Sequence, residues 1–347
     1  MKSQSEFVGE MEDCEAGILI LHRNQEKKMN TDYSIKLLSD KARSLHGTAI
    51  QSVLRHADIN KLKERIHIFQ NMDIQSLSDK ELEANIDEVL SVKLDGGITI
   101  STIFSEYSLF GIGERFYRVR KLINTNMPNG ELKNVSAYWN PPPKYVKHYG
   151  RLNKPRESLL YTAFNPYTAI CETNLKPGDS FVLCIYEAIK PLRFSWIGGK
   201  TDYDFNGIKN KKAIEFLETM KQFLVDEFTR IIPEGQESLY RITETIAKTY
   251  YASSDDNGWR YPSIKNTFED NICFLSERVM YNVKLVGAII ATFNESNEKD
   301  PHEMKMSVEY VVVGPNMDKY YPYESEKGEK YMEKLFPEFV IERLANN

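Results

Sequence analysis

The sequence has little cysteine and no pairing pattern among the cysteines it has. None of the four forms a CxxC pair, and they are scattered as Cys14, Cys171, Cys184 and Cys273. Cysteines without that spacing are not typical of a disulfide framework or a zinc site. We therefore expect reduced thiols, mostly buried in apolar segments, and no bound metal.

Long apolar runs and a basic excess are also missing. No stretch approaches the length that spans a bilayer, and residues 1–17 carry acids where a signal peptide needs an apolar core. The formal net charge is −5, whereas proteins that track nucleic-acid phosphates are usually basic. These absences favour a cytoplasmic protein with neither a membrane nor a nucleic acid as partner.

The common nucleotide and hydrolase motifs are absent as well. The chain contains no GxGxxG, GxxxxGK[ST], HExxH or GxSxG segment. Any enzymatic function must therefore rest on other residues.

Hydrophobic patterns divide the chain at about residue 105. Residues 1–105 are polar and mostly helical in pattern, with a helix over 49–69 and another starting at 76–81, and they carry no recognisable chemistry. Residues 106–347 contain short segments rich in β-branched and aromatic residues, which predict strands at 114–120, 159–164, 181–188, 281–293 and 306–313.

Two amphipathic helices interrupt this second region, over 211–232 and 237–251. The first lies in what we interpret as a helical insertion at about 204–234. Because strands and helices do not alternate regularly, the pattern predicts an α+β fold, with covering helices on a sheet, rather than a doubly wound parallel one.

A single carboxylate ends an otherwise apolar stretch at residues 159–172. Asn165 and Pro166 supply an N-cap and a first-turn proline, which predict a short helix after the strand. Glu172 lies within that helix, before the stop at Pro177 and Gly178. A charged side chain on a short helix that packs against a strand requires a physical explanation.

Several separated segments together resemble one family, the RES domain. They are FYRV at 116–119, GRLN at 150–153, a strand bearing Tyr161, AICE at 169–172 and GWRYPSIK at 258–265, followed by NICF at 271–274. The resemblance spans roughly residues 108–315. Two departures are KPRE at 154–157, where the family commonly has a glycine, and Lys265, where an arginine is common.

The resemblance implies a fold similar to ADP-ribosyltransferase toxins, with a mixed sheet core and covering helices. It also implies NAD as substrate and no other cofactor. Members are typically toxins of toxin–antitoxin pairs that destroy NAD by hydrolysis or phosphorolysis, or that transfer ADP-ribose to a protein. The partners implied are NAD, inorganic phosphate or an acceptor protein, and a separate antitoxin or a second copy of the chain.

The chemistry assigns a role to each motif residue. Breaking the nicotinamide–ribose bond builds positive charge on the sugar, which Glu172 would stabilise while Ser263 donates a hydrogen bond to it. Arg118 and Arg151 would bind the pyrophosphate, because a guanidinium fork suits phosphate oxygens. Tyr161 offers a face for the nicotinamide ring. The expected catalytic residues are thus Glu172, Ser263 and Arg118, and the expected NAD-binding residues Arg118, Arg151 and Tyr161.

Each residue also has a plainer interpretation. Glu172 would then be a solvated surface glutamate, the two arginines would be surface ion pairs, Tyr161 would be core and Ser263 a turn residue. For the whole chain the alternatives are protein ADP-ribosylation, or a non-catalytic regulator that binds NAD or another protein. Residues 1–105 would provide restraint or a dimer contact, so that their removal would raise activity.

Overall fold

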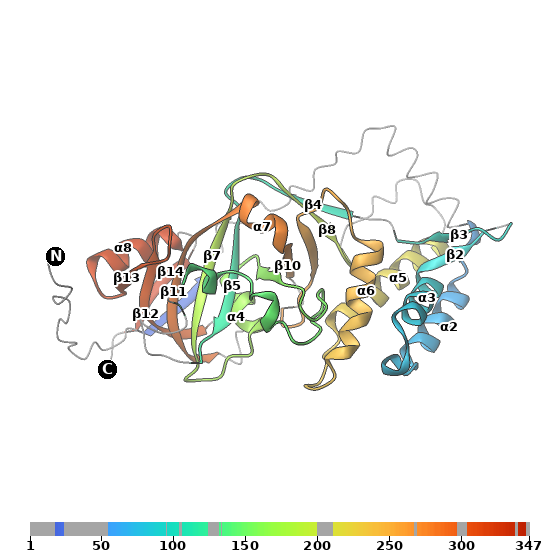
Figure 1. Ribbon diagram of the computed structural model, residues 1–347, viewed down its shortest axis with the longest axis horizontal. Coiled ribbons are helices and arrows are strands. Elements are labelled where there is room, and N and C mark those ends of the chain that lie inside the picture. The colour runs from blue at the N-terminus through green and yellow to red at the C-terminus, as the bar shows by residue number, and fades with distance from the viewer. Residues whose placement is uncertain are drawn as a thin grey trace.

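The computed structural model describes residues 18–23, 55–94, 96–103, 106–123, 132, 134–199, 211–266, 269–296, 304–336 and 339–344. Within them the chain folds as α+β, with one large mixed sheet and seven α-helices. The predicted fold class is confirmed at this level. Figure 1 shows the sheet extending through the body, with α8 beside its C-terminal strands and a group of helices at the opposite end.

The large sheet has twelve strands in the order β14-β1-β12-β11-β7-β5-β6-β10-β9-β8-β4, and β13 pairs with β12. Neighbours run antiparallel except β8 and β9, which are parallel. The strands are β1 Ile18–Arg23, β4 Glu106–Phe110, β5 Arg115–Lys121, β6 Leu159–Ala163, β7 Ser180–Ala188, β8 Leu192–Trp196, β9 Gly258–Pro262, β10 Asp270–Leu275, β11 Val283–Ser296, β12 Met304–Val313, β13 Lys319–Pro322 and β14 Phe339–Leu344. A second sheet joins β2 Ser91–Lys93 to β3 Thr99–Ser101.

The large sheet is weakly joined at its middle. β5 pairs with β7 along its whole length, from Arg115 to Lys121. Its pairing with β6 on the other side consists of one residue pair, Tyr117 with Ala163. The two strands therefore diverge from this point, which leaves room for a cleft between two halves of the sheet.

Local capping signals fix two helices as predicted. The side chain of Asn165 accepts a 2.7 Å hydrogen bond from Thr168 N and Pro166 occupies the first turn, so α4 runs over Pro166–Glu172. Ser78 and Glu81 form a reciprocal capping box at the start of α3 Asp79–Leu90. In both helices the start follows from sequence-local hydrogen bonds.

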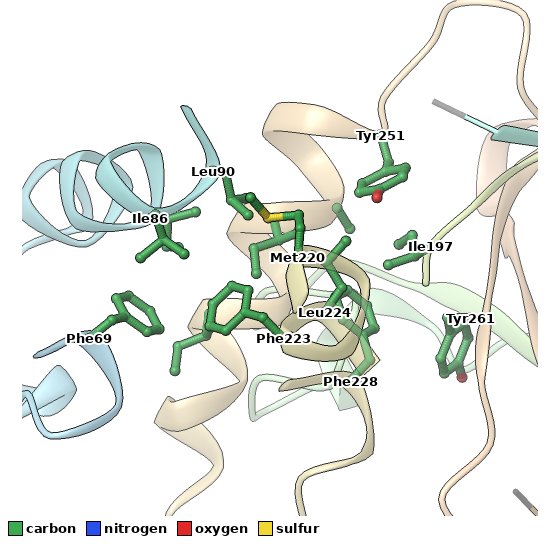
Figure 2. Close-up of a cluster of buried hydrophobic side chains, with 14 of the residues drawn as sticks. Phe69, Ile86, Leu90, Ile197, Met220, Phe223, Leu224, Phe228, Tyr251 and Tyr261 are labelled. Atoms are coloured by element: carbon green, nitrogen blue, oxygen red, sulfur yellow. The ribbon is translucent and has the colours of Figure 1, made fainter. Parts of the chain in front are cut away.

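Four helices form a layer at one end of the sheet: α2 Ile59–Gln70, α3, α5 Lys211–Thr229 and α6 Arg241–Tyr250. Their apolar faces meet in one buried cluster, in which Phe69 of α2 and Ile86 of α3 pack with Phe223 and Leu224 of α5 (Figure 2). The cluster continues to Tyr261 of β9, so the helical layer and the sheet share a core.

The region before residue 105 is therefore not an isolated helical unit. It supplies α2 and α3 to this layer, and β1 to the large sheet between β12 and β14. Sequence patterns missed this because β1 is short and its pairing partners lie near the other end of the chain. The predicted insertion supplies α5, the central helix of the layer.

All five predicted strands are present within a few residues, although a helix displaces the start of one of them. Residues 276–282 form α7 Ser276–Asn282, so the strand predicted to start at Tyr281 begins instead at Val283. The helix predicted over 237–251 is a 3₁₀ turn, Glu237–Tyr240, followed by α6. The remaining helix, α8 Glu326–Leu335, packs on β11, β12 and β13.

Two further expectations concern membrane-spanning helices and the state of the cysteines. Among the described helices, none combines the length and apolar character needed to cross a bilayer. Cys184 and Cys273 are free and buried, whereas Cys171 is free and half-buried. Cys14 lies outside the described residues.

Candidate active site

A cleft of about 390 Å³ opens where β5 and β6 diverge. Its walls come from β5, β6, the C-terminal end of α4, and β9 and β10. The lining residues are Tyr117, Arg118, Val119, Pro141, Val146, Asn153, Glu157, Leu159, Tyr161, Thr162, Ala163, Ala169, Glu172, Thr173, Tyr261 and Asn271. Three of the five residues singled out from the sequence line it: Arg118, Tyr161 and Glu172.

Glu172 is the last residue of α4 and is half-buried at the cleft wall. Its Oε1 atom accepts two hydrogen bonds, one of 2.5 Å from Ser263 Oγ and one of 2.9 Å from Asn271 Nδ2. The carboxylate is thus neither a freely solvated surface group nor a partner in an ion pair among the described residues. Two neutral donors hold it in place.

Ser263 does not line the cleft but lies directly behind Glu172. It is buried, and its hydroxyl accepts a 3.0 Å hydrogen bond from Asn266 N while donating to Glu172. The hydrogen bond from Ser263 to Glu172 expected from the sequence is present. Because the backbone of Asn266 fixes the acceptor side of the hydroxyl, the proton is directed at the carboxylate.

Arg118 of β5 is among the residues that line the cleft. Strand alternation places its side chain on the face of Phe116, opposite that of Tyr117 and Val119. Burial raises the pKa of Cys184 and of Tyr186, and the charge of Arg118 opposes this rise by favouring their ionised forms. The Nη1 atom of Arg118 is buried and has no hydrogen-bond partner in the described part of the chain. An unsatisfied buried donor costs about 1–3 kcal/mol, and more when it carries charge. A bound anion that reached this guanidinium would offset that cost.

Tyr161 lines the cleft with its hydroxyl already engaged. The hydroxyl donates a 2.9 Å hydrogen bond to Asn153 Oδ1 and accepts one of 3.0 Å from Leu152 N. Burial raises the pKa of this phenol well above its usual value, so the group stays protonated and remains a donor. The ring is therefore held by the GRLN segment rather than free to reorient.

Arg151 is not among the cleft residues. Its guanidinium donates to the carbonyl oxygens of Glu227 and Arg230 at the end of α5, at 3.3 and 3.2 Å, and lies over the ring of Tyr240. Its own carbonyl accepts a 2.7 Å hydrogen bond from Thr243 Oγ1 of α6. The structure thus separates Arg151 from Arg118 and gives it the geometry of a C-terminal helix cap.

Two cleft residues lie inside the quoted motifs but were not singled out. Asn271 of β10 contacts Glu172, and Asn153 orients Tyr161. The sequence carries a signal for Asn271, because asparagine is uncommon in apolar strands, whereas Asn153 lies in the loop before β6 and carries no such signal. Periodicity alone does not say which way such a side chain points.

A second carboxylate in the cleft is neutralised by its surroundings. Glu157 forms an ion pair with Lys248 of α6 and accepts a 3.0 Å hydrogen bond from Lys154 N. Glu172 has no such cation among the described residues. The two acids therefore differ in what they can offer a ligand: Glu157 is compensated by Lys248, and Glu172 keeps its charge available.

Comparison of the chain with family models, with curated proteins and with solved structures found no match.

Proposed function

We propose that this protein cleaves the nicotinamide–ribose bond of NAD, with water or inorganic phosphate as the acceptor. The observation that carries the proposal is Glu172, a carboxylate at a cleft wall held by Ser263 and Asn271. The RES-domain resemblance assigns the same glutamate and serine to NAD chemistry, and they are adjacent in space although distant in sequence.

The arrangement suits a reaction that builds positive charge on a sugar. When nicotinamide leaves, the ribose becomes an oxocarbenium-like cation, and a carboxylate about 4 Å away attracts it by roughly 4 kcal/mol at an effective dielectric constant near 20. If that attraction arises only in the transition state, it accelerates the step about a thousandfold. Within the described part of the chain, Glu172 has no ion-pair partner that would cancel this charge.

Arg118 is the second group that we assign to the substrate. It is among the cleft-lining residues of β5, and its buried Nη1 atom has no hydrogen-bond partner in the described residues. The pyrophosphate of NAD is an anion of the kind that a guanidinium binds through paired hydrogen bonds. We assign Arg118 to the pyrophosphate and Tyr161 to the nicotinamide side, where its ring offers a flat, fixed surface.

The proposal extends to the fold type and to the biological role. The mixed sheet with a cleft between its halves supports an ADP-ribosyltransferase-like fold. A toxin role, a cytoplasmic location and restraint by an antitoxin rest on the motif resemblance alone.

The decisive experiment incubates the purified protein with NAD, with and without inorganic phosphate, and follows the products by mass. We expect free nicotinamide together with ADP-ribose, or with ADP-ribose phosphate when phosphate is the acceptor. Glu172→Gln should lose at least about a hundredfold in rate, whereas Glu324→Gln, at an exposed glutamate between β13 and α8, should keep the wild-type rate. Unchanged NAD under both conditions would refute the proposal.

Protein ADP-ribosylation is tested in the same preparation. Labelled NAD is added with cell protein, and the label is followed into macromolecules. Transfer that requires Glu172 and exceeds free ADP-ribose formation would reassign the acceptor to a protein side chain.

A further inference from the structure

The two oxygen atoms of the Glu172 carboxylate have unequal surroundings. Oε1 accepts from both Ser263 Oγ and Asn271 Nδ2. Oε2 has no hydrogen-bond partner among the described residues, although the side chain lines the cleft. The terminal torsion of a glutamate is broad and nearly two-fold, so its oxygens exchange unless neighbours distinguish them. Here two donors on one atom make that distinction.

Asn271 is well placed to hold the carboxylate rigidly. It lies in β10 and is paired on both sides, with Ala163 of β6 and with Tyr261 of β9. Its side chain is 6% exposed and lies at the cleft wall. A strand paired along both edges fixes the position of the amide, and a side chain on such an element is positioned more precisely than one on a loop.

The two donor side chains are also held by different parts of the structure. Ser263 lies just after β9, where its hydroxyl is oriented by Asn266 N. Asn271 lies within the neighbouring strand. Loss of either one leaves Oε1 with a single donor, about which the carboxylate can rotate. Both are needed to fix the plane of the group.

We infer that Asn271 is a positioning residue for the proposed NAD cleavage: with Ser263 it anchors Oε1 of Glu172 and leaves Oε2 as the oxygen that faces the ribose. This inference rests on the proposed function. Asn271 then affects the chemical step, because it acts through Glu172. It has little effect on the binding of NAD. The amide is neutral at every working pH, so it orients the carboxylate without cancelling its charge.

The test measures kcat and KM for NAD in Asn271→Leu, which removes the donor at nearly constant volume. We expect kcat to fall about 10- to 100-fold, the usual effect of losing a hydrogen bond to a charged group, with KM within about threefold of wild type. Asn271→Asp should fall further, because a second carboxylate would then lie beside Glu172.

A double-mutant cycle separates positioning from general damage. In the Glu172→Gln background the residual rate should be unchanged by Asn271→Leu, because a residue that acts through Glu172 has nothing left to position. Asn257→Leu serves as the matched control: Asn257 is 9% exposed and accepts from Arg193 N, outside the residues that line the cleft. It should lose stability but keep kcat.

The possible results distinguish failure of the Asn271 inference from failure of the proposed NAD cleavage. If the wild-type protein leaves NAD intact, both the proposed function and the inference are overturned. Active wild type with unchanged kcat in Asn271→Leu, or equal losses in the presence and absence of Glu172, overturns the inference and leaves the function standing. If Asn271→Leu does not fold, Asn271→Ser is measured instead, since it keeps a polar group at the buried position but shortens its reach. A wild-type kcat in that variant equally overturns the inference.

Discussion

Ser263 donates a 2.5 Å hydrogen bond to Glu172 across 91 residues of sequence. The two residues belong to different elements, since Glu172 ends α4 and Ser263 follows β9. Their contact therefore depends on the pairing of β6, β10 and β9 in one sheet. It brings together a half-buried carboxylate and a neutral donor, and no described residue supplies an ion-pair cation to that carboxylate.

This contact leads to a prediction for Ser263→Ala. Removing the hydroxyl leaves Glu172 with Asn271 as its one remaining donor, so kcat for NAD cleavage should fall about 10- to 100-fold. The KM for NAD should change little, because Ser263 does not line the cleft. Steady-state kinetics and thermal unfolding measured together check this. A variant that unfolds at the same temperature and retains full kcat would show that the hydroxyl is not needed.

The two arginines expected to bind pyrophosphate should behave differently. Arg118→Gln should raise the KM for NAD about 10- to 100-fold, because a charge-assisted contact with the pyrophosphate is lost.

Arg151→Gln should instead lower the free energy of unfolding by roughly 1–3 kcal/mol, because two hydrogen bonds to the end of α5 are lost. Its effect on KM should stay within about threefold. Kinetics and urea unfolding of both variants make the comparison. If Arg151→Gln raised the KM for NAD and left the free energy of unfolding unchanged, Arg151 would be assigned to pyrophosphate binding after all.

A buried acid in the helical layer predicts a pH dependence of stability. Burial raises the pKa of Glu227 from 4.5 to about 7, although the nearby Arg230 guanidinium lowers it. The folded state therefore holds this proton more tightly than the unfolded chain. The contribution of Glu227 is most favourable below about pH 4.5 and is lost as the pH rises through 7, by up to roughly 3 kcal/mol.

Urea unfolding of wild type and Glu227→Gln at pH 5 and pH 8 measures this contribution. The variant should gain stability relative to wild type on going from pH 5 to pH 8. Glu218→Gln, at an exposed residue of the same helix, should show no such change. The same difference between wild type and Glu227→Gln at both pH values would contradict the prediction.

The helical layer predicts that residues 1–105 cannot simply be removed. Deletion would uncover the apolar face of α5 that packs on α2 and α3. We therefore expect an aggregated or unfolded protein rather than the more active one expected for a restraining segment. Circular dichroism and size-exclusion chromatography of the truncated chain test this. A folded, monodisperse and more active truncation would favour restraint instead.

A single substitution tests the same interface between α2 and α5 without removing any element. Phe69 is 1% exposed and meets the ring of Phe223 edge-on at a centroid distance of 5.8 Å. Phe69→Ala should cost about 3–5 kcal/mol. Its neighbour Ile68 is 50% exposed, so Ile68→Ala should cost less than about 1 kcal/mol. Equal losses in the two variants would show that α2 does not pack on α5 in this way.

The sequence by itself determined the local elements and the α+β class. The start of α4 follows from Asn165 and Pro166, and the start of α3 from Ser78 and Glu81, because capping joins residues three or four apart. The strands around Tyr161 and Leu183 were readable because β-branched and aromatic runs are local signals as well. Glu172 also stood out in the sequence as a charged residue at the end of an apolar stretch.

Tertiary structure alone decided which side chains meet. Arg118 lies in a predicted strand and Arg151 precedes one, yet Arg118 is part of the cleft wall and Arg151 contacts the end of α5. Asn271 contacts Glu172 through a strand pairing that periodicity does not encode, and β1 joins the large sheet beside strands from the far end of the chain. The physical reason is that hydrogen-bond direction and strand pairing depend on contacts distant in sequence, whereas capping and hydrophobic period depend on near neighbours.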